Sequence, residues 1–368
     1  MTEPREPRRR ALLGAGLGLG GALTLGACSA GPDSGSPGVG AGVPSGATPP
    51  SESALPSPAS SAASTLPEGV EVGVPGVSPF RVPNEEFFQI DTTRGLPRLD
   101  AARWSLRIHG MVEREITLTY AQLLARPLIE RDITLSCVSN EVGGDLLGNA
   151  AWLGTRIAPI LAEAGPSPEA DMVLSKSFDG WTASTPLEVL TDSRDALFAI
   201  GMNREVLPQR NGFPVRMVVP GLYGFVSATK WVVDLEVTRF DKAKAFWSTR
   251  GWSDHGPVKL SSRIDAPRGG ARLTAGRIAV GGVAWSPHVG IRGVEVRVDD
   301  GAWQPARLGA VPGVDTWRQW AFTWDATPGD HRLTVRAIDA TGQVQTGEEA
   351  PVAPDGATGW HSIEVSVR

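Results

Sequence analysis

Cysteine, tyrosine and histidine are scarce in this chain, which limits the kinds of site it can build from side chains alone. Among 368 residues there are two cysteines, two tyrosines and five histidines, against twelve tryptophans. Two cysteines allow one disulfide at most, although each has another local explanation, given below. The histidines show no metal-ligand spacing, and we interpret them as ordinary core or surface residues: His109, His255, His288, His331 and His361.

The chain has no excess of positive charge, since its formal net charge is −5 at pH 7. It therefore lacks the clustered lysine and arginine that a nucleic-acid surface requires. Its composition is ordinary for a globular protein, with 41% hydrophobic and 20% charged residues. Without a targeting segment and a linker, about 300 residues would remain to fold, enough for two domains that each bury a core.

No apolar run is long enough for a permanent membrane span, which needs about 20 strongly apolar residues. The stretch Ala11–Leu25 is apolar but short and rich in glycine, and it follows the basic run Arg8–Arg10. Residues 1–28 are therefore typical of a signal peptide. The arginine pair resembles a twin-arginine signal, whose route exports proteins already folded and suits a protein that takes up a cofactor in the cytoplasm.

The segment Leu25-Gly26-Ala27-Cys28 resembles a lipobox. Cleavage before Cys28 would leave that cysteine to carry more than one acyl chain, enough for stable anchoring; the alternative is a plain cleaved signal with an incidental cysteine. Residues 29–69 predict a disordered Ser/Pro/Gly linker, because such a segment cannot bury enough surface to offset its ordering entropy. We expect an exported protein, lipid-anchored at the extracytoplasmic face of the cell membrane or periplasmic.

Residues 70–255 mix strand-like and helix-like patterns. Residues 104–108 alternate like a strand, Thr119 can N-cap a short helix over 119–124, and 157–164 has helical spacing. A strand over 133–135 leads directly into Cys137, and 215–220 is a continuous apolar run of the kind found in buried strands. The mixture predicts an α+β domain.

Residues 256–368 change to an all-β pattern. Residues 294–298 alternate cleanly, and 299–301 (Asp-Asp-Gly) turn the chain. Three more groups of apolar residues are each expected to share one face of a strand: Trp320, Phe322 and Trp324; Leu333, Val335 and Ala337; Ile363, Val365 and Val367. Several short strands with regular turns predict an immunoglobulin-like sandwich.

Four short motifs follow one another between residues 80 and 250. They are Asn84-Glu85-Glu86-Phe87-Phe88; 135–140 (Leu-Ser-Cys-Val-Ser-Asn); 211–216 (Asn-Gly-Phe-Pro-Val-Arg) continued by 218–221 (Val-Val-Pro-Gly); and Thr229-Lys230-Trp231. In order and spacing they resemble the entry motif, the Cys-x-x-Asn motif and the pterin-binding stretch of the sulfite oxidase superfamily of molybdopterin-dependent oxidoreductases. The resemblance extends over residues 80–368, because the β region is similar to the dimerisation domain of that family.

The resemblance implies that Cys137 binds one molybdenum per chain, beside the dithiolene of one molybdopterin. A thiolate is a soft, anionic donor suited to a redox-active metal, and one cysteine suffices because the pterin supplies the other sulfurs. The alternative is a buried apolar cysteine. For Arg216 the alternative is a surface salt bridge, but an arginine inside an apolar run needs an anionic partner, such as the cofactor phosphate. The other cofactor contacts implied by the resemblance are Phe88, Gln89, Ser177, Asn211, Ala228, Thr229 and Lys230.

The sequence departs from the sulfite oxidases where those enzymes hold their dianionic substrate. Where the sulfite oxidases have a Phe-Phe-x-Arg motif, this chain has Ile90 at the position of the arginine. Where they have an arginine after the Cys-x-x-Asn motif, this chain has Glu141 after Asn140. Their active-site tyrosine aligns with Trp252, five residues after Trp247. Because a dianion in such a pocket would be poorly paired, these changes favour a neutral or organic substrate. The C-terminal sandwich, in contrast, resembles that of the sulfite oxidases, so the substrate is left open.

We therefore expect a two-electron oxygen-atom transfer enzyme acting on a small sulfur oxo compound or an organic sulfoxide. The chain shows no haem-binding module of the animal sulfite oxidases, so we expect no haem and a separate electron-transfer partner, a cytochrome or a membrane haem protein. By resemblance, residues 258–368 would form a homodimer. The alternative is a non-catalytic lipoprotein that keeps the fold as a binding module; a surface adhesin is disfavoured because the motifs lie outside the sandwich.

Overall fold

The computed structural model describes residue 55, residues 64–93 and residues 95–368. The predicted signal peptide, Cys28 and most of the predicted linker lie outside the described residues. Within the described part, no helix is both long and apolar enough to span a membrane.

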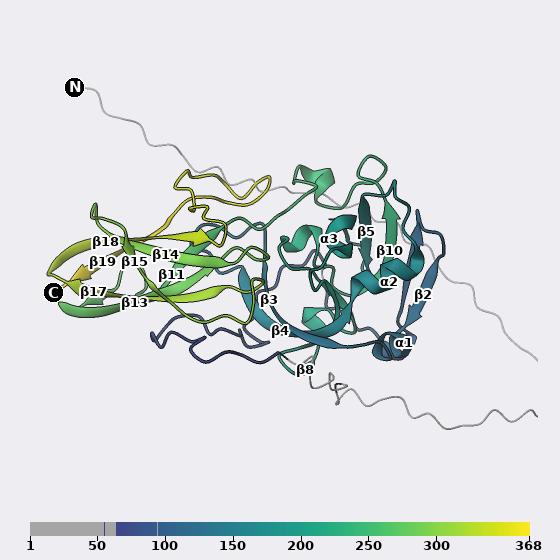
Figure 1. The fold of residues 1–368 in the computed structure, drawn as a ribbon, viewed down its shortest axis with the longest axis horizontal. Helices are drawn as coiled ribbons and strands as arrows, with labels where there is room; N and C mark the ends of the chain where they lie inside the picture. Colours follow the sequence, from purple (N-terminus) through teal and green to yellow (C-terminus); the bar gives the residue numbers. More distant parts are fainter. Residues whose placement is uncertain (1–54, 56–63, 94) are drawn as a thin grey trace, which may run out of the picture. The chain divides into compact units, whose positions relative to one another are not determined.

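Two sheets and a few short helices form the region that contains the four motifs (Figure 1). The first sheet has the order β2 (Ile116–Thr119), β1 (Ser105–Gly110), β10 (Val232–Thr238), β5 (Met172–Ser177) and β6 (Thr182–Pro186). The second has the order β3 (Ile129–Ser136), β4 (Leu147–Arg156), β7 (Leu197–Met202) and β8 (Glu205–Val206), with β9 (Arg216–Val218) also pairing β7. The α-helices are α1 (Tyr120–Leu124), α2 (Ile157–Ala164) and α3 (Leu187–Thr191). Single 3-10 turns are η2 (Ala101–Arg103), η3 (Gln209–Asn211), η4 (Gly224–Val226) and η5 (Ser248–Arg250).

The predicted local signals of this region are confirmed. Thr119 caps α1 with a capping box, in which its side chain and that of Gln122 each bond the other's main-chain N–H. Helix α2 ends at Gly165, whose left-handed conformation terminates the helix as expected for a C-terminal glycine. The strand predicted to lead into Cys137 is the end of β3. The region as a whole is mostly β. The predicted α+β class is therefore confirmed only in part, because the helices that accompany the sheets are short.

Two facing antiparallel-rich sheets form the predicted sandwich. One has the order β11 (Ser261–Ala266), β13 (Gly276–Trp285), β17 (Arg318–Ala326) and β16 (Arg307–Leu308). The other has the order β12 (Arg272–Leu273), β19 (His361–Val367), β18 (Gly329–Asp339), β14 (Ile291–Val298) and β15 (Gln304–Pro305). The three apolar groups predicted to share strand faces pack together in one core, with Phe322 partly buried at its edge. Alternation with a period of two placed these side chains correctly because one face of each sheet is buried.

The sandwich and the motif-bearing region share buried contacts. Trp317, from the loop before β17, is 1% exposed and belongs to the core cluster of the first region. Its indole N–H donates to the carbonyl of Phe80 at 2.9 Å, and its main-chain N–H donates to Thr134 Oγ1 of β3 at 2.7 Å. Such a buried, hydrogen-bonded tryptophan holds the two regions in a defined contact.

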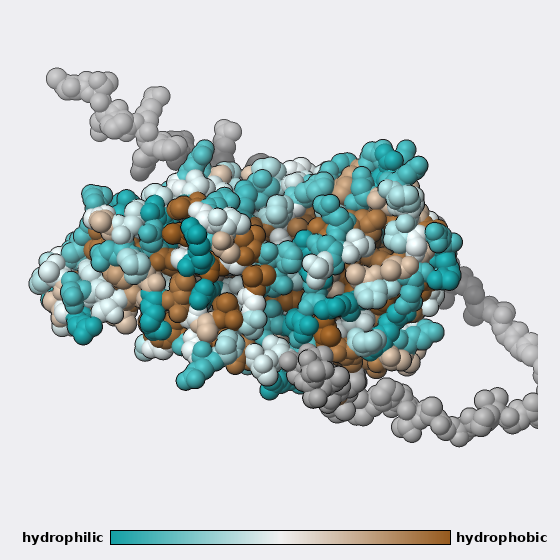
Figure 2. Space-filling model, in the orientation of Figure 1, coloured by the Kyte–Doolittle hydropathy of each residue, from teal (hydrophilic) through white to brown (hydrophobic). Residues whose placement is uncertain are grey.

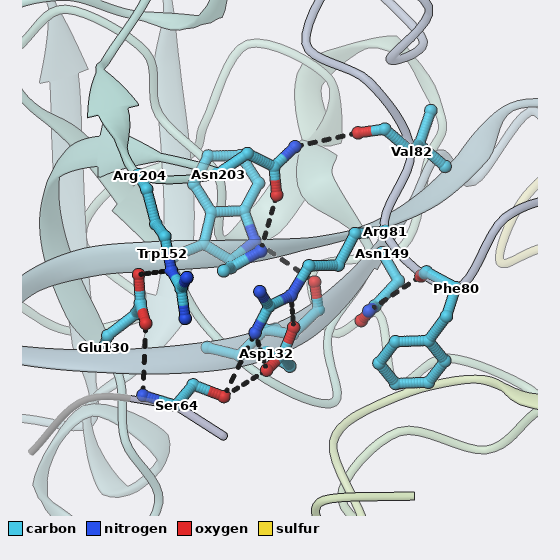
Figure 3. A network of polar contacts seen from close by, with 12 residues as sticks. Ser64, Phe80, Arg81, Val82, Glu130, Asp132, Asn149, Trp152, Asn203 and Arg204 are labelled. Atoms are coloured by element: carbon cyan, nitrogen blue, oxygen red, sulfur yellow. Dashed lines mark hydrogen bonds and ion pairs between the residues drawn. The ribbon is translucent and has the colours of Figure 1, made fainter. Parts of the chain in front are cut away.

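A buried polar network attaches the start of the described chain to β3 (Figure 3). The Ser64 main-chain N–H donates to Glu130 at 3.1 Å, and the Ser64 hydroxyl donates to Asp132. Arg81 makes a two-pronged ion pair with Asp132, at 2.7 and 2.9 Å. Ser64 lies inside the segment predicted as linker, so ordered contacts begin before residue 70.

Polar residues cover most of the molecular face shown in Figure 2, and apolar residues appear between them. The large apolar side chains that are exposed include Ile90 and Leu96, both 49% exposed, and Phe178, which is 59% exposed. Of these, Ile90 borders the cavity described next, and Phe178 lies between two residues that line it.

Candidate active site

A cavity lies beside Cys137 and contains about 960 Å³ of free space, part of it continuous with solvent. Its wall is built from segments that are distant in sequence: 87–92, 135–139, 177–181, 211–231 and 247–252. Three of these segments, 87–92, 135–139 and 211–231, overlap the motifs. Clefts walled by several segments and open on one side are where small molecules and cofactors bind.

Cys137 follows β3 directly and presents its thiol to the cavity. The sulfur accepts a hydrogen bond from the Ser139 main-chain N–H at 3.4 Å. Burial raises the pKa of the Cys137 thiol, and the hydrogen bonds from Ser139 oppose that rise. A metal would displace the thiol proton, because thiolate is the ligating form. Among the described residues no group of three or more His, Cys, Asp or Glu could hold a metal, so a metal at Cys137 would take its remaining ligands from a cofactor.

Arg216 is an almost fully buried cation in the cavity wall, 5% exposed. Among the described residues, its guanidinium donates only to main-chain carbonyls, those of Asn211 at 3.1 Å and of Ala228 and Met217 at 3.4 Å. It also lies over the Trp152 ring, 5.0 Å from the ring centre. Burial lowers the pKa of Arg216 to about 10, opposed by the charge of Asp91. An ionised guanidinium without a contacting anion is a costly arrangement that a bound phosphate would relieve.

Lys230 is the second buried cation of the wall. Its Nζ forms an ion pair of 2.5 Å with Asp91, and its side chain is 13% exposed. Burial lowers the pKa of Lys230 and neighbouring Arg216 adds to the effect, whereas Asp91 raises it. Gly212 packs against the base of both side chains, because a Cβ there would be 3.0 Å from the Arg216 Cβ and 3.1 Å from the Lys230 Cβ. Its φ of 114° also favours glycine.

Two polar atoms of the cavity wall are buried without a hydrogen-bond partner. They are Ser177 Oγ, at the end of β5, and Asn211 Oδ1, at the end of η3. Buried polar groups are nearly always bonded, so an unpaired hydroxyl and an unpaired amide oxygen facing one cavity indicate a ligand with donors and acceptors. With the thiol of Cys137 and the cationic pair of Arg216 and Lys230, they fit a long cofactor that carries sulfur, a polar heterocycle and phosphate.

The structure brings most of the predicted site residues together, but not all. Cavity-lining positions are held by Phe88, Cys137, Ser177, Asn211, Arg216, Ala228 and Lys230. Gln89 is exposed and does not line the cavity, and the Thr229 hydroxyl instead bonds that of Ser175 at 2.7 Å. The predicted cofactor contacts of Gln89 and Thr229 stay predictions. Cys28 lies outside the described residues.

Aromatic side chains form much of the remaining wall. Trp247 and Trp252 meet edge to face with ring centres 6.2 Å apart, and Phe225 lies 6.1 Å from Trp252. Trp181 also lines the cavity, as does Asp179. The sequence reasoning did not find Trp181, Asp179 or Asp91, because no motif marks them and only the fold brings their loops to the cavity.

Comparisons with known proteins identify the family of this chain. The family model for the oxidoreductase molybdopterin binding domain matches residues 93–247, and that for a bacterial Ig domain matches residues 261–335. A Bacillus subtilis protein, uncharacterized oxidoreductase YuiH, is 32% identical over 165 residues, which cover 45% of this chain and 80% of that protein. Sulfite oxidase of Gallus gallus is 28% identical over 328 residues, covering 74% of this chain and 70% of the enzyme. The mitochondrial enzyme of Homo sapiens is 28% identical over 345 residues, covering 78% of this chain, and the match spans only 62% of that enzyme.

A solved structure has the same arrangement. The sulfane dehydrogenase SoxCD of Paracoccus pantotrophus superposes with a TM-score of 0.68 and 25% sequence identity, over 79% of this chain and 82% of that one.

The fold and the cavity define a molybdopterin-binding oxidoreductase with an immunoglobulin-like domain. The chain belongs to the molybdopterin-dependent oxidoreductase family that includes the sulfite oxidases. It is therefore an enzyme, and the alternative of a non-catalytic binding module is not favoured.

The family implies a molybdenum–molybdopterin cofactor, and the residues present fit it. Cys137 would hold the metal, Arg216 and Lys230 the phosphate end, and Ser177 and Asn211 the polar atoms of the pterin. When bound, the cofactor supplies two-electron redox chemistry, while the protein orients it and sets its electrostatic surroundings.

Proposed function

We propose that this protein is an exported molybdenum enzyme that carries out two-electron oxygen-atom transfer on a neutral organic sulfur compound, such as a sulfoxide. The main observation behind this proposal is the kind of residue that forms the cavity wall near Cys137. The lining residues nearest to Cys137 in the chain, Leu135, Ser136, Val138 and Ser139, carry no charge. The aromatic pair Trp247 and Trp252 lies in the same wall.

A dianion such as sulfite is poorly accommodated by this wall. The cavity's two cations, Arg216 and Lys230, are the pair assigned to the cofactor phosphate, and the remaining charged lining residues, Asp91 and Asp179, are acidic. Unpaired burial of an anion is costly, whereas aromatic faces favour an apolar substrate with a positively polarised sulfur. Glu141, which replaces a family arginine, is exposed and does not line the cavity, so it adds no repulsion there.

The test begins with the molybdenum-to-protein ratio of the full chain, expressed in a host that makes molybdopterin, beside Cys137→Ala. We expect a ratio near one in the native protein and a large loss of metal in the variant. Dialkyl and alkyl-aryl sulfoxides are then assayed with a reduced viologen as electron donor, and the corresponding sulfides and sulfite are assayed with ferricyanide as acceptor. Sulfite turnover far above that of every neutral sulfur compound would refute the substrate assignment.

A gain-of-function variant sharpens this test. Ile90 stands where the sulfite oxidases have arginine, and its side chain lines the cavity. Ile90→Arg should strengthen inhibition or turnover by sulfite roughly tenfold or more, because it supplies a charge-assisted hydrogen bond to the dianion. Leu96→Arg is the matched control, since Leu96 is equally exposed, at 49%, but does not line the cavity. Equal effects of the two variants would mean that general surface charge, and not the cavity, determines the response.

Location and partners complete the proposal. The predicted twin-arginine signal and the lipobox at Cys28 support export and a lipid anchor, and mass spectrometry of the mature N-terminus tests both. Electrons would pass from a separate redox protein to the cofactor when a sulfoxide is reduced, and the direct assay is sulfoxide-dependent oxidation of a reduced c-type cytochrome by the enzyme. The predicted homodimer is tested by light scattering of the full chain.

A further inference from the structure

The ten residues between β3 and β4 form a closed loop that begins at Cys137 and ends at Leu146. The Cys137 main-chain N–H donates to the Leu146 carbonyl at 2.9 Å, which continues the β3–β4 ladder by one pair. Asn140 joins the two sides, because its main-chain N–H donates to the Cys137 carbonyl at 3.1 Å and its Oδ1 accepts from the Leu146 N–H at 2.8 Å. The base of the loop is therefore held by the second sheet itself.

The tip of this loop is held by the sandwich. Arg263, on β11, donates from Nη1 to the Gly144 carbonyl at 2.7 Å. The same guanidinium bonds Asp265 at 2.5 Å and Ser78 Oγ at 2.9 Å, and the Arg263 and Asp265 side chains are only 10% and 6% exposed. A buried cation fixed on three sides has little freedom, so Gly144 is bonded to a rigid donor.

A second contact lies beside the first. The His361 imidazole, at the start of β19, packs against Gly143 so closely that a Cβ there would lie 2.3 Å from the ring. Gly143 has a φ of 78°, which glycine adopts readily. The ring is oriented by the Ile264 main-chain N–H, which donates to Nδ1 at 3.0 Å. The glycine pair 143–144 thus fits between two side chains of the sandwich.

We propose that Arg263 and His361 are positioning residues for Cys137: by holding the loop tip they set the direction in which the thiolate meets the metal. This inference rests on one part of the proposed function, namely that Cys137 is the metal ligand. The physical reason is that a metal ligand must be held within about 0.5 Å of its working position by a supporting shell. A loop held only at its base could pivot there, whereas contacts at base and tip leave one orientation. The sandwich then helps to position the metal ligand, in addition to any role in forming a dimer.

Two variants remove the tip contacts without leaving a buried charge. His361→Ala removes the ring from Gly143. Arg263→Gln combined with Asp265→Asn removes the bond to Gly144 and neutralises both partners of the buried ion pair, since removing one alone would destabilise the sandwich. The matched control is Arg336→Gln combined with Glu295→Gln, a partly buried ion pair of 2.7 Å that joins β18 and β14 of the same sandwich.

The first measurement is the rate at which iodoacetamide alkylates Cys137 in the cofactor-free full chain, followed on the Cys137 peptide by mass spectrometry so that Cys28 does not contribute. Both tip variants should react about tenfold faster or more, because loss of a charged hydrogen bond or a packed ring eases local opening of the loop. The control pair should change the rate less than about twofold under the same conditions.

The second measurement is made on cofactor-loaded protein and reads the geometry at the metal. The Mo(V) electron paramagnetic resonance g-values and the thiolate-to-metal absorption band should shift in the tip variants and stay constant in the control. Unchanged alkylation and unchanged spectra would overturn the positioning role even if activity fell. Absence of molybdenum from wild-type protein would instead refute the proposed function, and the alkylation rates would still decide whether the sandwich restrains Cys137.

Discussion

Arg216 should contribute much more to stability when the cofactor is bound than when it is absent. In the cofactor-free protein it is a buried cation whose contacts are carbonyls and a tryptophan ring. Burial lowers its pKa from the usual arginine value to about 10, which corresponds to roughly 3 kcal/mol against the charged form. Its three carbonyl hydrogen bonds, two of them long, return about 2–3 kcal/mol in total. These opposing contributions nearly cancel, so Arg216→Met should change the free energy of unfolding of the cofactor-free protein by no more than about 1–2 kcal/mol.

With the cofactor bound, the same substitution leaves a phosphate without its buried partner. Loss of one partner from a buried, hydrogen-bonded charge pair costs about 2–5 kcal/mol, or roughly 30- to several-thousandfold in retention of the cofactor. The measurement is urea unfolding of protein made in hosts with and without molybdopterin synthesis, together with pterin content after gel filtration. Arg216→Lys should lie between wild type and Arg216→Met, because lysine keeps the charge but loses the two-pronged geometry.

A second arginine serves as the control. Arg318, on β17, also donates to main-chain carbonyls, those of Gly309 at 2.7 Å and Ile291 at 2.8 Å, but lies in the sandwich. Arg318→Met should destabilise the loaded and the cofactor-free protein by the same amount. If Arg216→Met behaved like Arg318→Met, with equal loss in both states and normal pterin content, Arg216 would be a structural residue and its assignment to the phosphate would be wrong.

Two further predictions concern stability alone. Arg81→Met should lower the free energy of unfolding in urea by about 3–5 kcal/mol, because it leaves Asp132, whose side chain is 1% exposed, without its cation. Adding Asp132→Leu should recover much of this loss. If it recovers nothing, Arg81 stabilises the protein through packing and not through its charge. Burial and the nearby charge of Arg263 lower the pKa of His361, while Asp265 raises it. Because the folded protein favours the neutral ring, stability should be complete above the ordinary histidine pKa of about 6.5 and should fall as the pH drops from there toward the lowered value. Unfolding midpoints of wild type and His361→Gln between pH 5 and 7.5 measure this, and identical slopes would exclude the histidine as the cause.

The sequence predicted elements whose signals are local. The capping box at Thr119, the helix ending at Gly165 and the alternating faces of the sandwich depend on residues a few positions apart, and each is present as expected. The position of Cys137 was also predictable, because a strand pattern ran directly into it. The mainly β character of the first region was less evident, since continuous buried runs such as 215–220 do not alternate.

The cavity depends on contacts between distant residues. Arg216 and Asn211 were expected there from their motif, whereas Asp91 and Trp181 were not, because nothing near them in the chain signals that they face Cys137. For Thr229 the sequence placed the residue in the right loop but could not decide which way its hydroxyl points, and it bonds Ser175. Side-chain direction in a loop is determined by what packs around it, which a linear pattern does not record.

By itself, then, the amino-acid sequence determined the family and the order of a mixed domain and a β-sandwich, and it predicted which cysteine would bind the metal, since these follow from motifs and periodicity within short stretches. Only the tertiary structure decided that Arg216 contacts no anionic side chain in the part of the chain that the structure describes, that Lys230 pairs with Asp91, and that Arg263 and His361 contact the tip of the Cys137 loop. The physical reason is the same in each case. The free energy of a buried charge, and the orientation of a ligand loop, depend on which distant atoms fill the surrounding space, and that is known only once the chain has folded.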